Sequence, residues 1–190
     1  MKLYKKTIIF CFLLVSCMVF SQESIIVWGT KPLAWKHFQA KLSKHSKFDA
    51  NSHLKIKSTY SVYQDLLKCR IVAEFNTKKS KIKTKGIASK LLLKHEQLHF
   101  DIAEYQARLF RKELASYQFK SKKTIGCEMR KLRKKYYKLS KKMQSEYDAE
   151  TNHSINEVEQ KKWNRKVKFK LERSIDFSSP NISLDLVYSK

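Results

Sequence analysis

Residues 125–147 carry the most regular hydrophobic pattern in this chain. Apolar side chains recur there every three or four positions, while lysine and arginine fill many of the positions between them. This spacing predicts a helix with one buried face, beginning near Ile125 and reaching at least Tyr147. We interpret the apolar stripe as core rather than as a cofactor site. Its members are Ile125, Met129, Leu132, Tyr136, Leu139, Met143 and Tyr147.

A long helix is also predicted before this one, from Ile87 or Ser89 to about Tyr117. The stretch contains no glycine or proline and consists mostly of good helix formers. Only a short connection, residues 120–124, then leads to the helix that starts near Ile125. So short a link predicts that the two helices pack side by side in antiparallel directions.

Alternating apolar and polar residues precede the helices. Residues 24–28, 54–63 and 67–75 predict strands, the last two joined as a hairpin. Residues 41–53 are interpreted as a loop, and the lysine-rich residues 78–85 as an exposed connection. The strands therefore predict a small antiparallel sheet ahead of the helix pair.

The C-terminal part adds two further elements. Residues 155–171 predict a third helix, and residues 175–188 predict either a final edge strand or a loosely held extension around Pro180. The whole pattern predicts an α+β fold, in which a small antiparallel sheet is followed by two long antiparallel helices. The predicted inward positions of the third helix are Val158, Trp163 and Val167.

The N-terminus has the pattern of a signal peptide. A basic start is followed by a mostly apolar run of 14 residues, 7–20, which is too short to span a bilayer comfortably. Cleavage after Ser21 would leave residues 22–190 as a single domain and direct the protein to a secreted or periplasmic location. In a competing interpretation Cys17 is the lipid anchor of a lipoprotein.

The chain is strongly basic, with 41 lysine and arginine residues against 17 aspartate and glutamate residues and a formal net charge of +24. Removing residues 1–21 takes away three lysines and no acid, which leaves +21. Such a charge favours anionic partners, among them a cell-envelope surface. Because the charge is spread along the sequence, we favour solvated lysine-rich faces. Nothing predicts a specific nucleic-acid partner or an oligomeric state.

Of the four cysteines, Cys11 and Cys17 fall in the predicted signal peptide. Cys69 and Cys127 remain in the mature chain. In an oxidising compartment they would form a disulfide if their geometry allows it, and two unrelated buried thiols are an equal alternative.

The chemical signature of the chain is His95-Glu96-x-x-His99 within the first long helix. Residues four apart on a helix share a face, so the two imidazoles can bind one Zn²⁺ ion. Glu96 is then placed as a general base that takes a proton from water and delivers it to a leaving amine. The motif therefore predicts a zinc-dependent hydrolysis of peptide bonds.

A catalytic zinc ion needs a third protein ligand. If the chain folds back near residue 121, the antiparallel pairing brings residues close to 148 opposite His95. His153 is the first choice, since imidazole suits zinc, and it requires the second helix to end or bend before it. Glu150 is the second choice.

Helix phase distinguishes Glu150 from the other carboxylates that are expected near His95. In an unbroken helix Glu150 shares the inner face with Tyr147, whereas Asp148 points about 100° away. Asp148 and Asp101 are therefore interpreted as carboxylates that orient a ligating histidine.

Four blocks of the sequence carry a family resemblance. They are Trp28 with Pro32-Leu33-x-Trp35-x-x-Phe38, Leu92-x-Lys94-His95-Glu96-Gln97-x-His99-Phe100-Asp101-Ile102-x-Glu104, Tyr147-Asp148-x-Glu150-Thr151-x-His153, and Gln160-x-x-Trp163. The set spans about residues 25–165 and resembles the DUF922 family of bacterial secreted proteins, which are predicted zinc-dependent proteases. The chain departs from the family at Ser154, where glycine is usual.

The resemblance implies metal binding by His95 and His99, catalysis by Glu96, and a role for the segment Asp148–His153. It agrees with a zincin-like, secreted zinc metallopeptidase that acts on a peptide or protein substrate. The alternative is a non-catalytic basic binding protein of the cell envelope with a structural or vestigial metal site. Glu96 discriminates between them, because a structural site has no need of a base.

Overall fold

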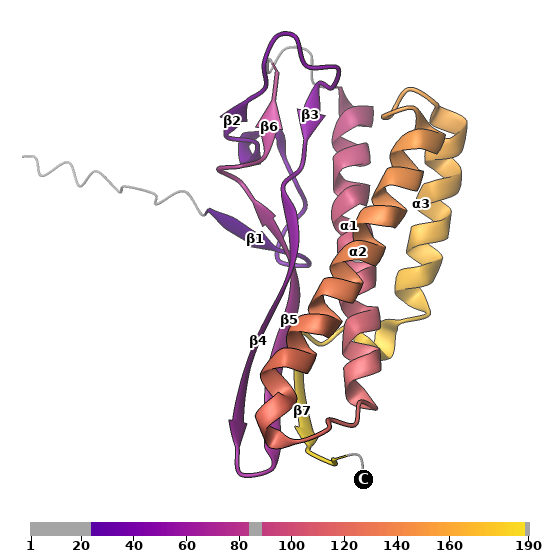
Figure 1. The fold of residues 1–190 in the computed structure, drawn as a ribbon. Coiled ribbons are helices and arrows are strands. Elements are labelled where there is room, and N and C mark those ends of the chain that lie inside the picture. Colours follow the sequence, from indigo (N-terminus) through magenta and orange to yellow (C-terminus); the bar gives the residue numbers. More distant parts are fainter. Residues whose placement is uncertain (1–23, 84–88, 189–190) are drawn as a thin grey trace, which may run out of the picture.

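The computed structural model describes residues 24–83 and 89–188, arranged as a layer of strands beside a layer of three long helices (Figure 1). The predicted signal peptide lies outside these ranges. The strands are β1 (Ile25–Val27), β2 (Ala40–Lys41), β3 (Ala50–Asn51), β4 (Leu54–Tyr63), β5 (Leu66–Asn76), β6 (Lys81–Ile82) and β7 (Asn181–Asp185). The helices are α1 (Lys90–Ala115), α2 (Ile125–Thr151) and α3 (Glu157–Glu172), with short 3₁₀ turns η1 (Trp35–His37), η2 (Lys122–Thr124) and η3 (Ile175–Phe177).

The long strand β5 organises the main sheet. β4 pairs with it in antiparallel register over its whole length, which confirms the predicted hairpin. β1 and β7 pair with opposite ends of the other edge of β5, so the C-terminal tail is an edge strand. Alternate side chains of β5 enter the core because successive residues of a strand point to opposite faces. The buried ones include Leu67, Cys69, Ile71, Ala73 and Phe75.

The helical layer also follows the predicted pattern. The hydroxyl of Ser89 caps α1 by accepting a hydrogen bond from the amide of Leu92 at 3.0 Å. α2 returns antiparallel to α1, and its apolar stripe is buried except at Leu139, which is 39% exposed. α3 buries Trp163 and Val167 but leaves Val158 exposed, because Val158 precedes the buried Gln160 by two residues and therefore points about 160° away from it on the helix. The prediction of Val158 as an inward residue was therefore wrong.

A second, smaller sheet joins three two-residue strands. β6 lies between β2 and β3, parallel to the first and antiparallel to the second. The segments 41–53 and 78–85 are thus not entirely loops as predicted, and Ile82 of β6 is buried. Strands of two residues are too short to show an alternating pattern, so the sequence did not predict them.

Charged side chains tie α1 to the sheet and to the C-terminal part. Arg111 is 1% exposed and donates hydrogen bonds to the carboxylate of Glu104, to the carbonyl of Ile71 at 2.7 Å and to the carbonyl of Phe177 at 2.6 Å. Burial raises the pKa of Glu104, while the nearby Arg111 and Arg108 guanidinium groups oppose that rise. This ion-paired network fixes the position of α1, which carries the His-Glu-x-x-His motif.

Two further expectations concern the cysteines and the membrane. Cys69 is buried and Cys127 is exposed, and both thiols are free, so the proposed disulfide is absent from the structure. No helix within the described ranges combines the length and apolar character that a membrane crossing requires.

Candidate metal centre

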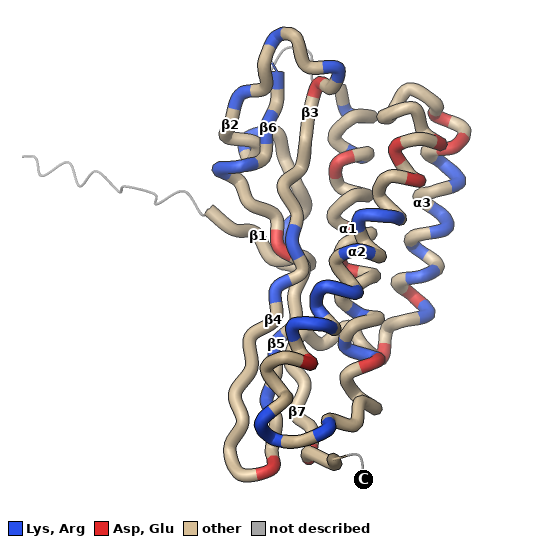
Figure 2. The backbone as a smooth tube through the Cα atoms, viewed as in Figure 1, with Lys and Arg blue, Asp and Glu red and all other residues tan. Residues whose placement is uncertain are grey.

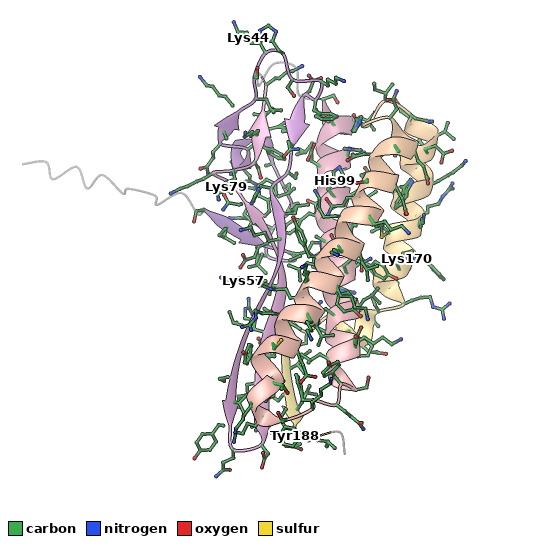
Figure 3. All side chains as sticks on the ribbon, in the orientation of Figure 1. Lys44, Lys57, Lys79, His99, Lys170 and Tyr188 are labelled. Atoms are coloured by element: carbon green, nitrogen blue, oxygen red, sulfur yellow. The ribbon has the colours of Figure 1, made fainter. Side chains whose placement is uncertain are left out.

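His95 and His99 lie one turn apart on the side of α1 that faces α2. Their side chains are buried, with residue exposures of 2% and 8%. The two Nε2 atoms are 3.1 Å apart, and the rings meet edge to face. Figure 3 labels His99 on α1, in the half of the molecule that also holds β3 and the end of α2. The motif therefore directs two imidazole nitrogens at one point.

Asp148 of α2 supplies a third donor at the same point. Its Oδ1 atom lies 3.1 Å from Nε2 of His95 and 3.0 Å from Nε2 of His99. The antiparallel pairing correctly predicted a residue near 148 at this level. It did not predict the direction of this side chain, since Asp148 was interpreted as an outer carboxylate that orients a histidine.

Glu150, the second choice for a third ligand, points elsewhere. Its Oε2 atom accepts a hydrogen bond from the indole of Trp163 at 2.7 Å. The expectation failed because α2 has two neighbours: α3 covers the flank of α2 that carries Glu150, and Asp148 is left facing α1. Glu150, which was predicted to point inward, thus contacts α3, and Asp148, two residues earlier, faces the histidines.

His153, the first choice, lies next to the centre but outside the group of converging atoms. Its Nδ1 atom is 3.5 Å from Oδ1 of Asp148, and its side chain is 45% exposed. The helix ends at Thr151, as this choice required, and three consecutive residues then have positive φ angles: Asn152 (46°), His153 (52°) and Ser154 (81°). This turn directs the His153 ring against Phe48, with ring centroids 4.6 Å apart.

The spacing of the three donors fits a metal ion. The ligand atoms of His95, His99 and Asp148 all lie within 4.8 Å of one another, and the measured pairs are 3.0–3.1 Å apart. Ligands at about 2.0–2.1 Å from a tetrahedral zinc ion are about 3.3 Å apart. Two imidazole nitrogens and a carboxylate oxygen packed this closely need a cation or protons between them. The group can therefore hold a metal ion.

A buried amide fixes the orientation of His95. Oε1 of Gln160 lies 3.1 Å from Nδ1 of His95 and accepts the hydroxyl of Tyr147 at 2.7 Å, while its Nε2 atom donates to Asn164 at 2.9 Å. An amide oxygen opposite Nδ1 requires Nδ1 to donate. In a neutral ring the lone pair is then on Nε2, the atom that faces the centre.

The ring of Tyr147 completes this support. It stacks on His95 with centroids 4.4 Å apart and is fully buried, and burial raises the pKa of its hydroxyl. The sequence placed Tyr147 in the core but did not reveal its role beside His95. Gln160 was visible only as part of the family resemblance.

Asp101 does not orient a histidine, contrary to the prediction. Its Oδ1 atom accepts hydrogen bonds from the indole of Trp28 at 2.8 Å and from the amide of Gln97 at 3.0 Å. Oε1 of Gln97 in turn accepts the backbone N–H of Leu33 at 2.8 Å. Asp101 therefore attaches α1 to the segment that follows β1.

Glu96 lines the same cleft as the three donors. It is 4% exposed, and its Oε2 atom accepts a hydrogen bond from the hydroxyl of Ser52 at 2.5 Å. The cleft has a volume of about 350 Å³ and lies between the residues around β3 and the C-terminal end of α2. Lys47 and Lys141 also line it. A carboxylate is thus held beside the histidines, next to space for another molecule.

The electrostatics keep Asp148 ionised. Burial by itself would raise the pKa of its carboxyl. Hydrogen bonds from the imidazoles of His95 and His99 when they carry a proton on Nε2, together with their positive charge, lower that pKa well below the usual range. Because a metal ligand must be deprotonated, Asp148 is in the required form at neutral pH.

Comparison with known protein families gives one match, over part of the chain. Residues 77–154 match the family described as "Bacterial protein of unknown function (DUF922)". The match includes α1, α2 and the turn after α2, so it covers His95, Glu96, His99, Asp148 and His153. No curated protein matches the chain. No solved structure matches it either.

Proposed function

We propose that this chain, whose residues 77–154 we assign to the DUF922 family, is a zincin-like, zinc-dependent metallopeptidase that acts outside the cytoplasm. The observation that carries the proposal is the convergence of two histidines and Asp148 on one point, with Glu96 in the same cleft. The predicted signal peptide supports the location.

His95, His99 and Asp148 would hold the ion. Two neutral imidazoles and one carboxylate are a ligand set that suits zinc and leaves further coordination positions for other molecules. When bound, zinc acidifies water and polarises a carbonyl group. Gln160 supports this role because it keeps the lone pair of His95 on the side of the centre.

Glu96 would act as the general base. In the proposed reaction its carboxylate takes the proton of the attacking water and passes it to the amine nitrogen as the peptide bond breaks. The hydrogen bond from Ser52 holds this carboxylate at the cleft without occupying both of its oxygens. Ser52 is therefore a positioning residue for Glu96.

The free edge of the sheet is an argument for a peptide as the substrate. Among the strands of residues 24–83 and 89–188, β4 pairs only with β5, so its outer edge is unpaired there along a strand that begins two residues after Ser52. An extended peptide can add to such an edge through main-chain hydrogen bonds. The cleft beside Glu96 would then receive the bond to be cleaved.

A non-catalytic binding protein with a structural metal site is the alternative. Structural zinc sites are usually closed by four protein ligands. In the described part of the chain, three ligand atoms converge, and they border a cleft that also contains a buried carboxylate. This arrangement favours catalysis.

The test compares zinc content and hydrolysis of a fluorescence-quenched peptide library for the wild type and Glu96→Gln. We expect both proteins to retain equimolar zinc, and hydrolysis by Glu96→Gln to fall by about 10²–10⁴-fold. Glu146→Gln on the exposed side of α2 is the matched control and should keep full activity.

Three results would count against the proposal. A wild type that binds no zinc would refute the metal site. Equal hydrolysis by wild type and Glu96→Gln would refute the role of Glu96. Equimolar zinc with no hydrolysis of any library peptide would favour the non-catalytic alternative.

A further inference from the structure

The outer face of α2 carries charge of a single sign. Between Met129 and Ser145 the helix contains eight lysine and arginine residues and no acid. Figure 2 shows these blue segments repeating along α2, with red segments only towards its two ends. We call the set the α2 basic face. Its members, all exposed, are Arg130, Lys131, Arg133, Lys134, Lys135, Lys138, Lys141 and Lys142.

These charges are largely uncompensated. Lys135 pairs with Glu113, and Lys142 lies 4.0 Å from Glu146. The other six have no carboxylate within 4.0 Å in residues 24–83 and 89–188. Like charges three or four residues apart destabilise a helix. A face that served only solubility would gain stability from mixed signs, so the exclusion of acids indicates an anionic partner.

α3 provides an internal comparison. It is also rich in lysine and has acids only near its two ends, but four of the six cations between Glu157 and Glu172 have a partner. Lys166 and Lys170 lie over the rings of Trp163 and Tyr105. Lys162 pairs with Glu159 at 2.6 Å, and Lys168 with Glu172 at 3.9 Å. The charge is spread along the sequence as a whole, and the structure shows that the acid-free group of cations in α2 is exposed on the outer face of this helix.

We propose that the α2 basic face binds the surface of a membrane that contains anionic lipids. Six of its eight cations are lysines, whose compact ammonium groups act through the local field rather than by bidentate recognition of one phosphate. The hollow between them is lined by five lysines and Leu139, with no hydroxyl, amide or carboxylate to select a particular head group. Juxtamembrane lysines are attracted to an anionic leaflet in this non-specific way.

Two exposed side chains flank the charges and fit the same partner. Tyr137 is 44% and Leu139 is 39% exposed. Lysine stems and such apolar groups reach the interfacial region while the ammonium groups remain hydrated. Between residues 130 and 142, Tyr137 is the one exposed aromatic side chain, so the face has no row of rings on which successive bases of a single-stranded nucleic acid could stack.

The α2 basic face also adjoins the candidate metal centre. Lys141 belongs to this face and lines the cleft. Asp148 follows seven residues later on α2, which corresponds to roughly 10 Å along the helix axis. Membrane binding through α2 would therefore hold the cleft close to the lipid surface. The binding itself requires neither zinc nor Glu96, so its test is independent of the proposed function.

The test is co-sedimentation of the full chain with vesicles of phosphatidylcholine, alone or with 30 mol% phosphatidylglycerol. The test variant replaces Lys131, Lys134, Lys138 and Lys142 by glutamine. The matched control replaces Lys161, Lys162, Lys166 and Lys168 of α3 by glutamine, so both lose four charges. All proteins share the apolar segment 7–20, whose contribution is measured on the neutral vesicles.

We expect the α2 variant to lose at least tenfold in affinity for the anionic vesicles and the α3 variant to lose less than threefold. Binding of the wild type should weaken steeply with added salt, because exposed charges are screened. Circular dichroism checks that both variants keep their helices.

Equal losses of affinity in the two variants would overturn the proposal, because the net charge of the protein, and not the α2 basic face, would then account for the binding. Equal binding to neutral and anionic vesicles would also overturn it. So would tighter binding of the wild type to duplex DNA or heparin than to the anionic vesicles, with the same dependence on the α2 lysines.

Discussion

The Nδ1 atom of His95 lies 3.1 Å from the Oε1 atom of Gln160, a residue of α3 that is 65 positions further along the chain. The contact is buried and also includes the hydroxyl of Tyr147. It makes α3 part of the candidate metal centre, although α3 contributes no atom to the three converging donors. The fold thus uses all three long helices to present one pair of histidines.

Loss of this acceptor should weaken metal binding. We expect Gln160→Leu to lower zinc affinity by about 10–100-fold, because His95 loses the hydrogen bond that fixes its tautomer. Gln160→Glu retains an acceptor and should keep most of the affinity. Competition with a chromophoric chelator measures both, with Lys161→Leu on the exposed side of α3 as control. Unchanged zinc affinity in Gln160→Leu would show that the Gln160 side chain does not contribute to metal binding.

The third ligand can be identified by a pair of substitutions. Asp148→Ala should abolish equimolar zinc binding, because Oδ1 of Asp148 lies within 3.1 Å of both histidine Nε2 atoms. His153→Ala should leave affinity within about tenfold, since its side chain lies outside the converging group. Isothermal titration with zinc distinguishes them. The opposite ranking would restore His153 as the ligand.

The buried ion-paired network should dominate the stability of α1. Arg111→Met removes one of the two guanidinium partners of Glu104, the other being Arg108, and the donor to two backbone carbonyls. Removing a partner from this buried ion-paired network is expected to cost about 3–5 kcal/mol of unfolding free energy. Urea denaturation measures the loss, and Lys112→Met, one position along on the exposed side, should change stability by less than about 1 kcal/mol. A similar small effect in Arg111→Met would show that Glu104 is satisfied by Arg108 alone.

The sequence alone predicted those elements whose hydrophobic periodicity indicates which side chains are buried. The β4–β5 hairpin and the antiparallel helix pair follow from patterns that extend over many residues. The antiparallel helix pair also predicted the position of the third donor along α2, because equal lengths of helix on both sides of a short connection bring His95 opposite residue 148. The direction of Asp148 did not follow. It depends on α3 packing against the Glu150 side of α2, which helix phase alone does not contain.

The remaining parts of the site depend on contacts between distant segments. Ser52 lies in a short connection between β3 and β4, 44 residues before Glu96, and no local pattern marks it. Asp101 follows the motif by two residues, yet its partner is Trp28 rather than a histidine. Proximity in sequence suggested a role at the metal centre, and tertiary packing assigned a structural one.

The connection between α1 and α2 should give the protein a pH-dependent loss of stability. Glu128 is buried and accepts hydrogen bonds from the hydroxyl of Tyr117 at 2.9 Å and from the amide of Lys120 at 3.2 Å. Burial would raise the pKa of its carboxyl, but these bonds and one from Thr124 lower it below the ordinary 4.5. The unfolded chain therefore binds the proton more tightly, so this stabilisation is complete above about pH 4.5 and disappears as the pH falls through the folded-state pKa.

We expect Glu128→Gln to unfold with about 1–2 kcal/mol less free energy at pH 7, because hydrogen bonds to a charged acceptor are stronger than those to an amide. The difference from wild type should shrink below pH 4.5, where the wild-type carboxyl becomes neutral too. Urea denaturation between pH 3 and pH 7 measures it. Glu146→Gln, exposed on the same helix, should stay within about 0.5 kcal/mol of wild type at each pH. A constant difference between Glu128→Gln and wild type would mean that the Glu128 side chain acts through its shape and not through its charge.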